Sequence, residues 1–77
     1  MAWLLKNSKG EYIKCIDTAN AKLEFTTDRK KAYDYSGLPG GGQWDADNQK
    51  YFIIYHFKKE FGDRVTTLKV VHEDIED

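Results

Sequence analysis

The sequence predicts one α+β domain: an antiparallel sheet of four to five strands built from two hairpins, with one short helix, in the order β-β-β-α-β-β. Three observations lead to this prediction. The chain has 77 residues, which leaves room for one hydrophobic core and not for two. Apolar residues make up 40% and aromatic residues 14%, which excludes intrinsic disorder despite 32% charged residues. Short aromatic and β-branched runs alternate with turn residues along most of the chain.

The N-terminal third predicts a hairpin and a third strand. Residues 3–5 and 12–16 are short apolar runs, and Asn7 and Gly10 between them are typical of a tight turn. Residues 17–25 then predict a second turn followed by a brief strand. These strands form the first part of the expected sheet.

A short helix is predicted over residues 28–35. Thr26 or Thr27 can cap its first turn. Gly37 suits the left-handed position after the last turn, and Pro39 prevents continuation. Because a helix of about two turns is not stable alone in water, we expect it to pack on one face of the sheet.

The second half predicts a long loop and a second hairpin. Residues 37–50 are rich in glycine and are expected to be irregular. Residues 51–57 are apolar at both alternating positions, as in a central strand covered on two faces. A turn at residues 60–63 leads to a last strand at 65–71. The side chains expected in the core are Leu4, Ile13, Leu23, Phe25, Ala32, Tyr33, Phe52, Ile54, Leu68 and Val70.

The charge distribution predicts a domain over residues 1–72 and an acidic C-terminal tail over residues 73–77. The formal net charge is −1. The tail carries four of the thirteen acidic residues, so that twelve basic residues face nine acidic ones in the remainder. Such a tail is either a shield for the basic body or a solubilising end.

The expected location is the cytoplasm. The single cysteine, Cys15, has no partner for an intramolecular disulfide, which favours a reducing compartment. The apolar run at residues 3–5 is too short for a signal peptide. No segment approaches the roughly 20 apolar residues that a membrane-spanning helix needs.

Catalytic, metal and cofactor motifs are not found, so neither an enzyme nor a cofactor is expected. Gly37 and Gly42 have the spacing of phosphate-loop glycines, but Gln43 and Trp44 stand where lysine and serine or threonine are required. The two histidines, at positions 56 and 72, are expected to lie too far apart in the second hairpin to share a metal. Cys15 is expected to be a buried, inert thiol within a strand.

The N-terminal half resembles small uncharacterised proteins encoded by phages and prophages of Gram-positive bacteria. Gly10-Glu11-Tyr12 ends the first hairpin, Phe25-Thr26 precedes the predicted helix, and Ala32-Tyr33 lies within it. The resemblance covers less than half of the chain and implies an accessory role. It carries over no active-site residues.

The second face of the predicted sheet leads to the main functional hypothesis. Trp3, Tyr12 and Tyr55 are expected on that face together with Ile53 and Phe57, and so many apolar side chains need a cover. We expect the loop at 37–50, a second copy of the chain or a protein partner to cover it. Four candidate partner-binding residues follow from this: Trp44, Tyr55, Trp3 and Tyr12. The expected function is therefore non-enzymatic protein binding.

Weak nucleic-acid binding is the alternative. Basic residues near exposed aromatic rings can hold phosphates while bases stack on the rings. The candidate basic residues are Arg29, Lys30, Lys31, Lys58 and Lys59. No known nucleic-acid-binding motif accompanies them.

Overall fold

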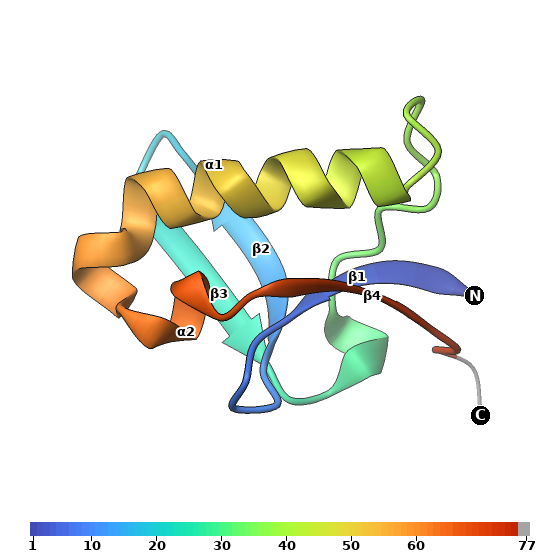
Figure 1. Cartoon of the computed structure of the whole chain (residues 1–77), viewed down its shortest axis with the longest axis horizontal. Helices are drawn as coiled ribbons and strands as arrows, with labels where there is room; N and C mark the ends of the chain where they lie inside the picture. The colour runs from blue at the N-terminus through green and yellow to red at the C-terminus, as the bar shows by residue number, and fades with distance from the viewer. Residues whose placement is uncertain (76–77) are drawn as a thin grey trace.

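The computed structural model describes residues 1–75 and has the predicted α+β class, with a four-stranded antiparallel sheet and one long helix (Figure 1). The elements in chain order are β1 (Ala2–Lys6), β2 (Tyr12–Asp17), β3 (Lys22–Thr26), η1 (Arg29–Lys31), α1 (Gln43–Phe61), α2 (Asp63–Thr66) and β4 (Lys69–Glu73). The first hairpin and the third strand are confirmed. The elements that follow residue 26 differ from the prediction.

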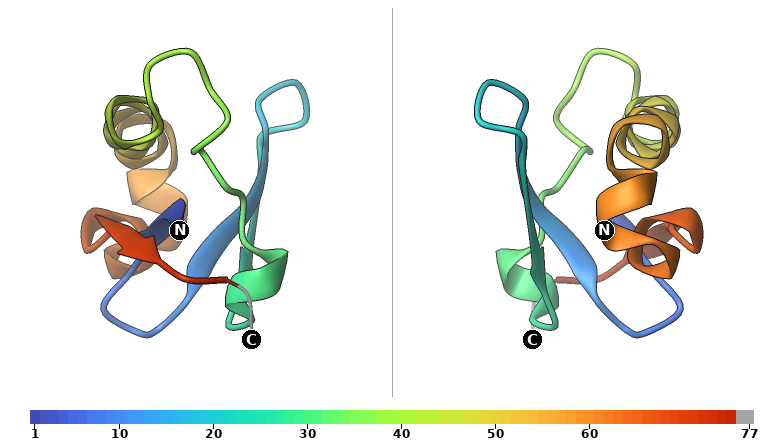
Figure 2. Two further views of the ribbon diagram at one scale, coloured as in Figure 1. Left: turned by 90° about the vertical axis from the view of Figure 1, so that its right-hand side faces the viewer. Right: turned by 90° about the vertical axis from the view of Figure 1, so that its left-hand side faces the viewer.

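The strand order in the sheet is β3-β2-β1-β4, and all neighbours are antiparallel. β1 and β4 pair along five positions, from Ala2↔Glu73 to Lys6↔Lys69. β2 pairs with β3 from Tyr12↔Thr26 onward, with an irregularity after Ile13. β1 and β2 pair at Lys6↔Tyr12, beside their connecting turn. The sheet is therefore two well-paired ribbons joined at one end (Figure 2).

The segment after η1 bridges the two ribbons, and the predicted helix over residues 28–35 is wrong. The Tyr33 N–H donates to the Ile13 carbonyl at 3.0 Å, and the Tyr35 N–H donates to the Trp3 carbonyl at 2.9 Å. Because these two N–H groups bond to β2 and β1, they are not available for helical bonds. Helical structure is limited to the single turn of η1, where Asp28 accepts from the Lys30 N–H.

The predicted central strand over residues 51–57 is also wrong, because these residues belong to α1. The helix begins after Gly42, whose N–H donates to the Asp45 carboxylate at 3.0 Å. It ends at Gly62, which has a φ of +57° and donates its N–H to the Lys58 carbonyl. Residues 43–61 thus form a helix of 19 residues between two glycines. The helix forms although the aromatic run within it has a preference for β structure.

The second hairpin is wrong as well. Gly62 joins α1 to the short α2, which contains Val65, and the last strand begins at Lys69. β4 returns beside β1, so the fourth strand pairs with the first and not with its neighbour in sequence. This placement brings the N-terminal and C-terminal strands side by side (Figure 1).

The core lies between α1 and the sheet. Three residues of α1 point inward and are buried: Ala46, Ile53 and Phe57. They pack in one cluster with Leu5, Ile13, Leu23, Tyr35, Val65 and Leu68. Of the predicted core, Leu4, Ile13, Leu23 and Leu68 are buried. Tyr33 and Phe52 are exposed, so their assignment to the core is wrong.

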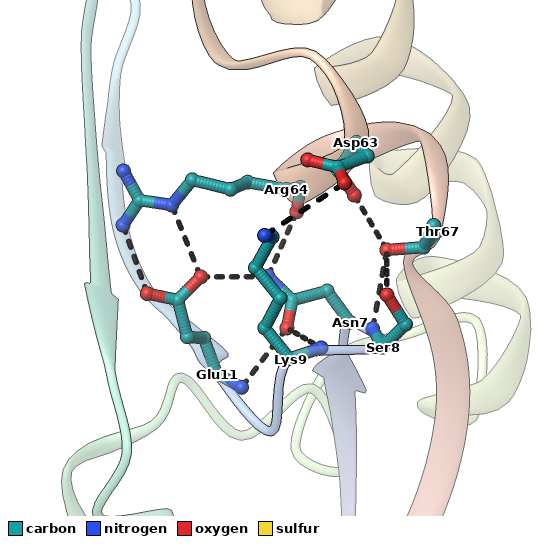
Figure 3. A network of polar contacts seen from close by, with 7 residues as sticks. All are labelled: Asn7, Ser8, Lys9, Glu11, Asp63, Arg64 and Thr67. Atoms are coloured by element: carbon teal, nitrogen blue, oxygen red, sulfur yellow. Dashed lines mark hydrogen bonds and ion pairs between the residues drawn. The ribbon is translucent and has the colours of Figure 1, made fainter.

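A polar clamp ties the β1–β2 turn to α2 and to Thr67, the residue that follows it (Figure 3). The buried Asn7 side chain accepts from the Lys9 and Glu11 N–H groups and donates to the Glu11 carboxylate and the Arg64 carbonyl. Arg64 Nε and Nη2 donate to the two Glu11 oxygens, each at 3.0 Å. On the other side of the turn, Ser8 bonds to Thr67. These bonds hold α2 against the first hairpin.

The acidic segment predicted as a tail, residues 73–77, begins within the folded domain. Glu73 is the last residue of β4 and accepts a hydrogen bond of 2.5 Å from the Tyr12 hydroxyl. Its carboxylate also lies 3.8 Å from Lys6 Nζ. Ile75 packs against the cluster formed by Ala2, Leu4 and Tyr12. Residues 73 and 75 are therefore part of the fold, and residues 76–77 lie outside the described chain.

Candidate protein-binding face

The outer side of α1 carries a line of exposed aromatic side chains, which we call the aromatic stripe: Trp44, Tyr51 and Tyr55, with Phe52 at its edge. The exposed fractions are 64% for Trp44, 61% for Tyr51, 83% for Tyr55 and 37% for Phe52. Residues seven and four apart lie on the same side of a helix, so residues 44, 51 and 55 form one row. One side of α1 faces the sheet and the other faces outward (Figure 2).

The stripe lies opposite the buried side of the same helix. Ala46, Ile53 and Phe57 pack on the sheet, so α1 is apolar on two sides. A surface helix ordinarily has one apolar side and one polar side. Burial in the core therefore explains why the inner side of α1 is apolar. The fold of a single chain does not explain why the aromatic stripe is apolar as well.

The glycine-rich segment before α1 passes close to two tryptophan side chains. A side chain at Gly40 would place its Cβ 2.5 Å from Trp44 Cε3. Gly42 has a φ of +92°, and a Cβ there would overlap with Trp3 Cδ1. Backbone conformation and close packing therefore both favour glycine at position 42, and at position 40 a side chain would have to displace Trp44. The predicted irregular loop at 37–50 is shorter than expected, because residues 43–50 are helical.

Charged groups flank the stripe along its length. Lys50 Nζ lies 4.6 Å from the centre of the Tyr51 ring and 3.2 Å from an Asp47 carboxylate oxygen. Lys58 and Lys59 are exposed in the last turn of α1. The flanks therefore carry the Asp47–Lys50 ion pair in the N-terminal half of the helix and two lysines near its C-terminal end.

The edge of the stripe is formed by contacting rings. The His56 ring lies 4.2 Å from the Phe52 ring and 5.0 Å from the Tyr55 ring, measured between ring centroids. These contacts limit the rotamers of the two aromatic side chains. A face with restricted side chains loses less entropy when a partner binds.

Two of the four predicted partner-binding residues lie on this face, and two do not. Trp44 and Tyr55 belong to the stripe. Trp3 is half-buried and its ring stacks on His72 with 3.9 Å between centroids. Tyr12 is 5% exposed and its hydroxyl bonds to Glu73. Burial, and then this hydrogen bond, raises the pKa of Tyr12.

Sequence reasoning missed Tyr51 and Phe52 as exposed residues. As strand residues they alternate between two covered faces, whereas helical spacing places Tyr51 four residues from Tyr55 on the outside. Gly42 and Gly62, which bound the 19 residues of α1, are the sequence signal for the ends of the helix.

The five candidate nucleic-acid-binding residues fall into two groups. Arg29, Lys30 and Lys31 lie on η1, beyond the end of β3. Lys58 and Lys59 lie near the end of α1, on the other side of the molecule (Figure 1). The structure therefore does not combine them into one basic patch.

A hollow of about 250 Å³ lies beneath the N-terminal half of α1. Its lining includes Ile16, Leu38, Cys15 and the nearly buried Tyr35, with Gln49 at its rim. Burial raises the pKa of Tyr35. Cys15 is exposed, so the expectation of a buried thiol is wrong. Among residues 1–75, no group of three His, Cys, Asp or Glu side chains is arranged to hold a metal ion.

Comparisons of the chain with protein-family models, with curated proteins and with solved structures found no match. In the part of the chain that the structure describes, no helix combines the length and the apolar character required to cross a bilayer.

Proposed function

We propose that this chain is a non-enzymatic protein-binding accessory protein that uses the aromatic stripe as its binding face. The observation that carries the proposal is the exposure of Trp44, Tyr51 and Tyr55 in one row on a well-anchored helix. Tryptophan and tyrosine are the residue types most enriched at the energetic centres of protein interfaces.

The physical reason is the cost of leaving such a surface in water. The four aromatic side chains expose about 500 Å² of surface, taking about 200 Å² for each full side chain. A contiguous apolar patch of several hundred Å² on a small protein typically marks an interaction site. The flanking lysines and Asp47 supply the polar rim that such interfaces have.

The proposed setting is the cytoplasm of a Gram-positive bacterium that carries a phage or prophage. Its support is the resemblance of Gly10-Glu11-Tyr12, Phe25-Thr26 and Ala32-Tyr33 to small phage-encoded proteins. An accessory protein in that setting acts on a protein of the host. The binding face does not depend on this setting, since it follows from α1 alone.

A capture experiment tests the proposal. The tagged wild-type chain and the double variant Tyr51→Ala/Tyr55→Ala are incubated with lysate of a Gram-positive bacterium, and captured proteins are identified by mass spectrometry. Tyr33→Ala is the matched control, because Tyr33 is an exposed tyrosine outside α1. A specific partner is captured by the wild type and by the control and is lost by the double variant.

Reconstitution with the purified partner completes the test. Calorimetric titration is expected to show binding weakened at least about tenfold by the double variant and unchanged by Tyr33→Ala, since hot-spot truncations cost about 2 kcal/mol or more. Equal affinity for all three chains contradicts the proposal.

Nucleic-acid binding is the rival function and has a separate test. Labelled single-stranded and double-stranded DNA and RNA are titrated at two salt concentrations against the wild type and a variant with Arg29, Lys30 and Lys31 changed to alanine. Salt-sensitive binding that the variant loses supports the rival. The absence of binding at low salt eliminates it.

A further inference from the structure

We infer that a second copy of this chain covers the aromatic stripe, with the two α1 helices packed antiparallel about a two-fold axis at Tyr51. This inference rests on the proposed function, because it assigns an occupant to the same face. It makes the free protein a homodimer whose interface a different protein partner must displace.

The positions of the stripe residues favour this arrangement. In an antiparallel pair centred on residue 51, a residue that precedes position 51 in one copy faces the residue that follows position 51 by the same number of positions in the other copy. Tyr51 then meets Tyr51 of the second copy, Asp47 meets Tyr55, and Trp44 meets Lys58. All three pairings are chemically complementary: two tyrosine rings, a hydroxyl donating to a carboxylate, and an ammonium group over an indole ring.

The charges favour the same direction. Asp47 and Lys58 are eleven residues apart, which is close to three full helical turns, so both lie on one flank of the stripe. With a two-fold axis perpendicular to both helices, this flank of one copy lies next to the same flank of the second copy. Asp47 of one copy then lies within about one helical turn of Lys58 of the other, and the contact forms twice. A parallel pair has no such opposite-charge contact.

The exposed area suits a weak dimer. The aromatic side chains supply about 500 Å² per copy, whereas a stable interface of standard size takes about 800 Å² from each partner. The stems of Lys58 and Lys59 extend the apolar contact, since long charged side chains cover apolar surface while their charged ends stay in water. We therefore expect a weak dimer, at the small end of specific interfaces.

Sedimentation equilibrium of charge variants tests the arrangement. Lys58→Glu and Asp47→Lys each place like charges together across the interface and are expected to weaken the dimer about tenfold or more. An equimolar mixture of the two variants restores the opposite-charge contacts at both ends, so a heterodimer with nearly the wild-type affinity is expected. Lys14→Glu, an exposed charge reversal on β2, is the matched control and leaves the affinity unchanged.

Disulfide trapping tests the position of the two-fold axis. In a Cys15→Ser background, which removes the exposed native thiol, Tyr51→Cys is expected to form a covalent dimer under mild oxidation. Lys58→Cys does not, because residue 58 faces residue 44 of the second copy. Efficient trapping of the Lys58→Cys variant, together with none of the Tyr51→Cys variant, overturns the antiparallel arrangement.

The outcomes separate this inference from the proposed function. A strict monomer at about 1 mM, a concentration at which even very weak dimers are populated, overturns the second copy as occupant. It leaves stripe-dependent capture of another protein intact. A dimer that neither charge variant weakens uses a different surface and also overturns the inference. Loss of captured partner in the stripe variant, with dimerisation unaffected, supports the proposed function alone and overturns the inference.

Discussion

At the scale of single residues, the molecule depends on a few side chains that hold distant segments together. Asn7 is 4% exposed and satisfies its amide with four hydrogen bonds, two of them from N–H groups of its own turn and one to the Arg64 carbonyl. The guanidinium of Arg64 pairs with Glu11 and lies 4.1 Å from the centre of the Phe25 ring. The turn at residues 7–10 is predictable from its asparagine and glycine, but its contact with residue 64 is not.

The Glu11–Arg64 pair predicts a loss of stability in acid. The hydrogen bonds from Arg64, and then that from Asn7, hold the pKa of Glu11 below its ordinary value of 4.5. Because the folded-state pKa is the lower one, the contribution of Glu11 is complete above pH 4.5 and is lost as the pH falls through the folded-state value.

Urea unfolding of the wild type and of Glu11→Gln between about pH 3 and 7 measures this effect. The wild type is expected to be more stable at pH 7, with a difference that shrinks below pH 4.5. The pKa values of Asp17 and Asp34 are also lowered, so the comparison with Glu11→Gln isolates the Glu11 contribution. A difference that does not change with pH contradicts the assignment.

At the scale of elements, residues 43–61 show how a local preference is overruled. The run from Tyr51 to Phe57 is rich in β-forming residues and is apolar at both alternating positions, which is compatible with a central strand. In the structure the same residues are helical, and only those on the inner side of the helix are buried. The glycines at 42 and 62, which define the helix ends, are the more informative local signal.

The glycine-rich connection predicts a graded response to substitution. Gly42→Ala is expected to lower the free energy of unfolding by about 2–5 kcal/mol, because its φ of +92° and its contact with the Trp3 ring both disfavour a side chain. Gly37→Ala is the control: a methyl group at that position would have no other atom within 4 Å, and its φ is not in the left-handed region. Urea unfolding followed by circular dichroism measures both. Equal effects at the two positions contradict the packing argument.

At the scale of the whole molecule, stability depends on one helix buried against two ribbons of sheet. The core cluster draws residues from β1, β2, β3, α1, α2 and the segment after η1, so no part of the chain buries its apolar side alone. A domain of this size has only about 5 kcal/mol or a little more in reserve. The outer side of α1 contributes little to that reserve, since its side chains remain in water.

Substitutions on the two sides of α1 are therefore expected to change the free energy of unfolding by very different amounts. Ile53→Ala removes a fully buried side chain and is expected to cost about 2–5 kcal/mol, enough to unfold much of the protein. Tyr55→Ala, two positions along, is expected to change the stability of the monomer by less than about 0.5 kcal/mol. Thermal unfolding at low protein concentration compares them. A large loss for Tyr55→Ala shows that the stripe is structural and removes the basis of the proposed binding face.

The sequence by itself determined the α+β class, the first hairpin, the third strand and the burial of Leu4, Ile13, Leu23 and Leu68. These features follow from turn residues and short-range alternation, which act over a few neighbouring positions. Only the tertiary structure decided that residues 51–57 are helical, that β4 returns beside β1 and that residues 33–35 bridge β1 and β2. Those features depend on contacts between segments far apart in the sequence, where packing and backbone hydrogen bonding outweigh local preference. The aromatic stripe depends on both: the sequence supplies the aromatic residues, and the helix places them in one row.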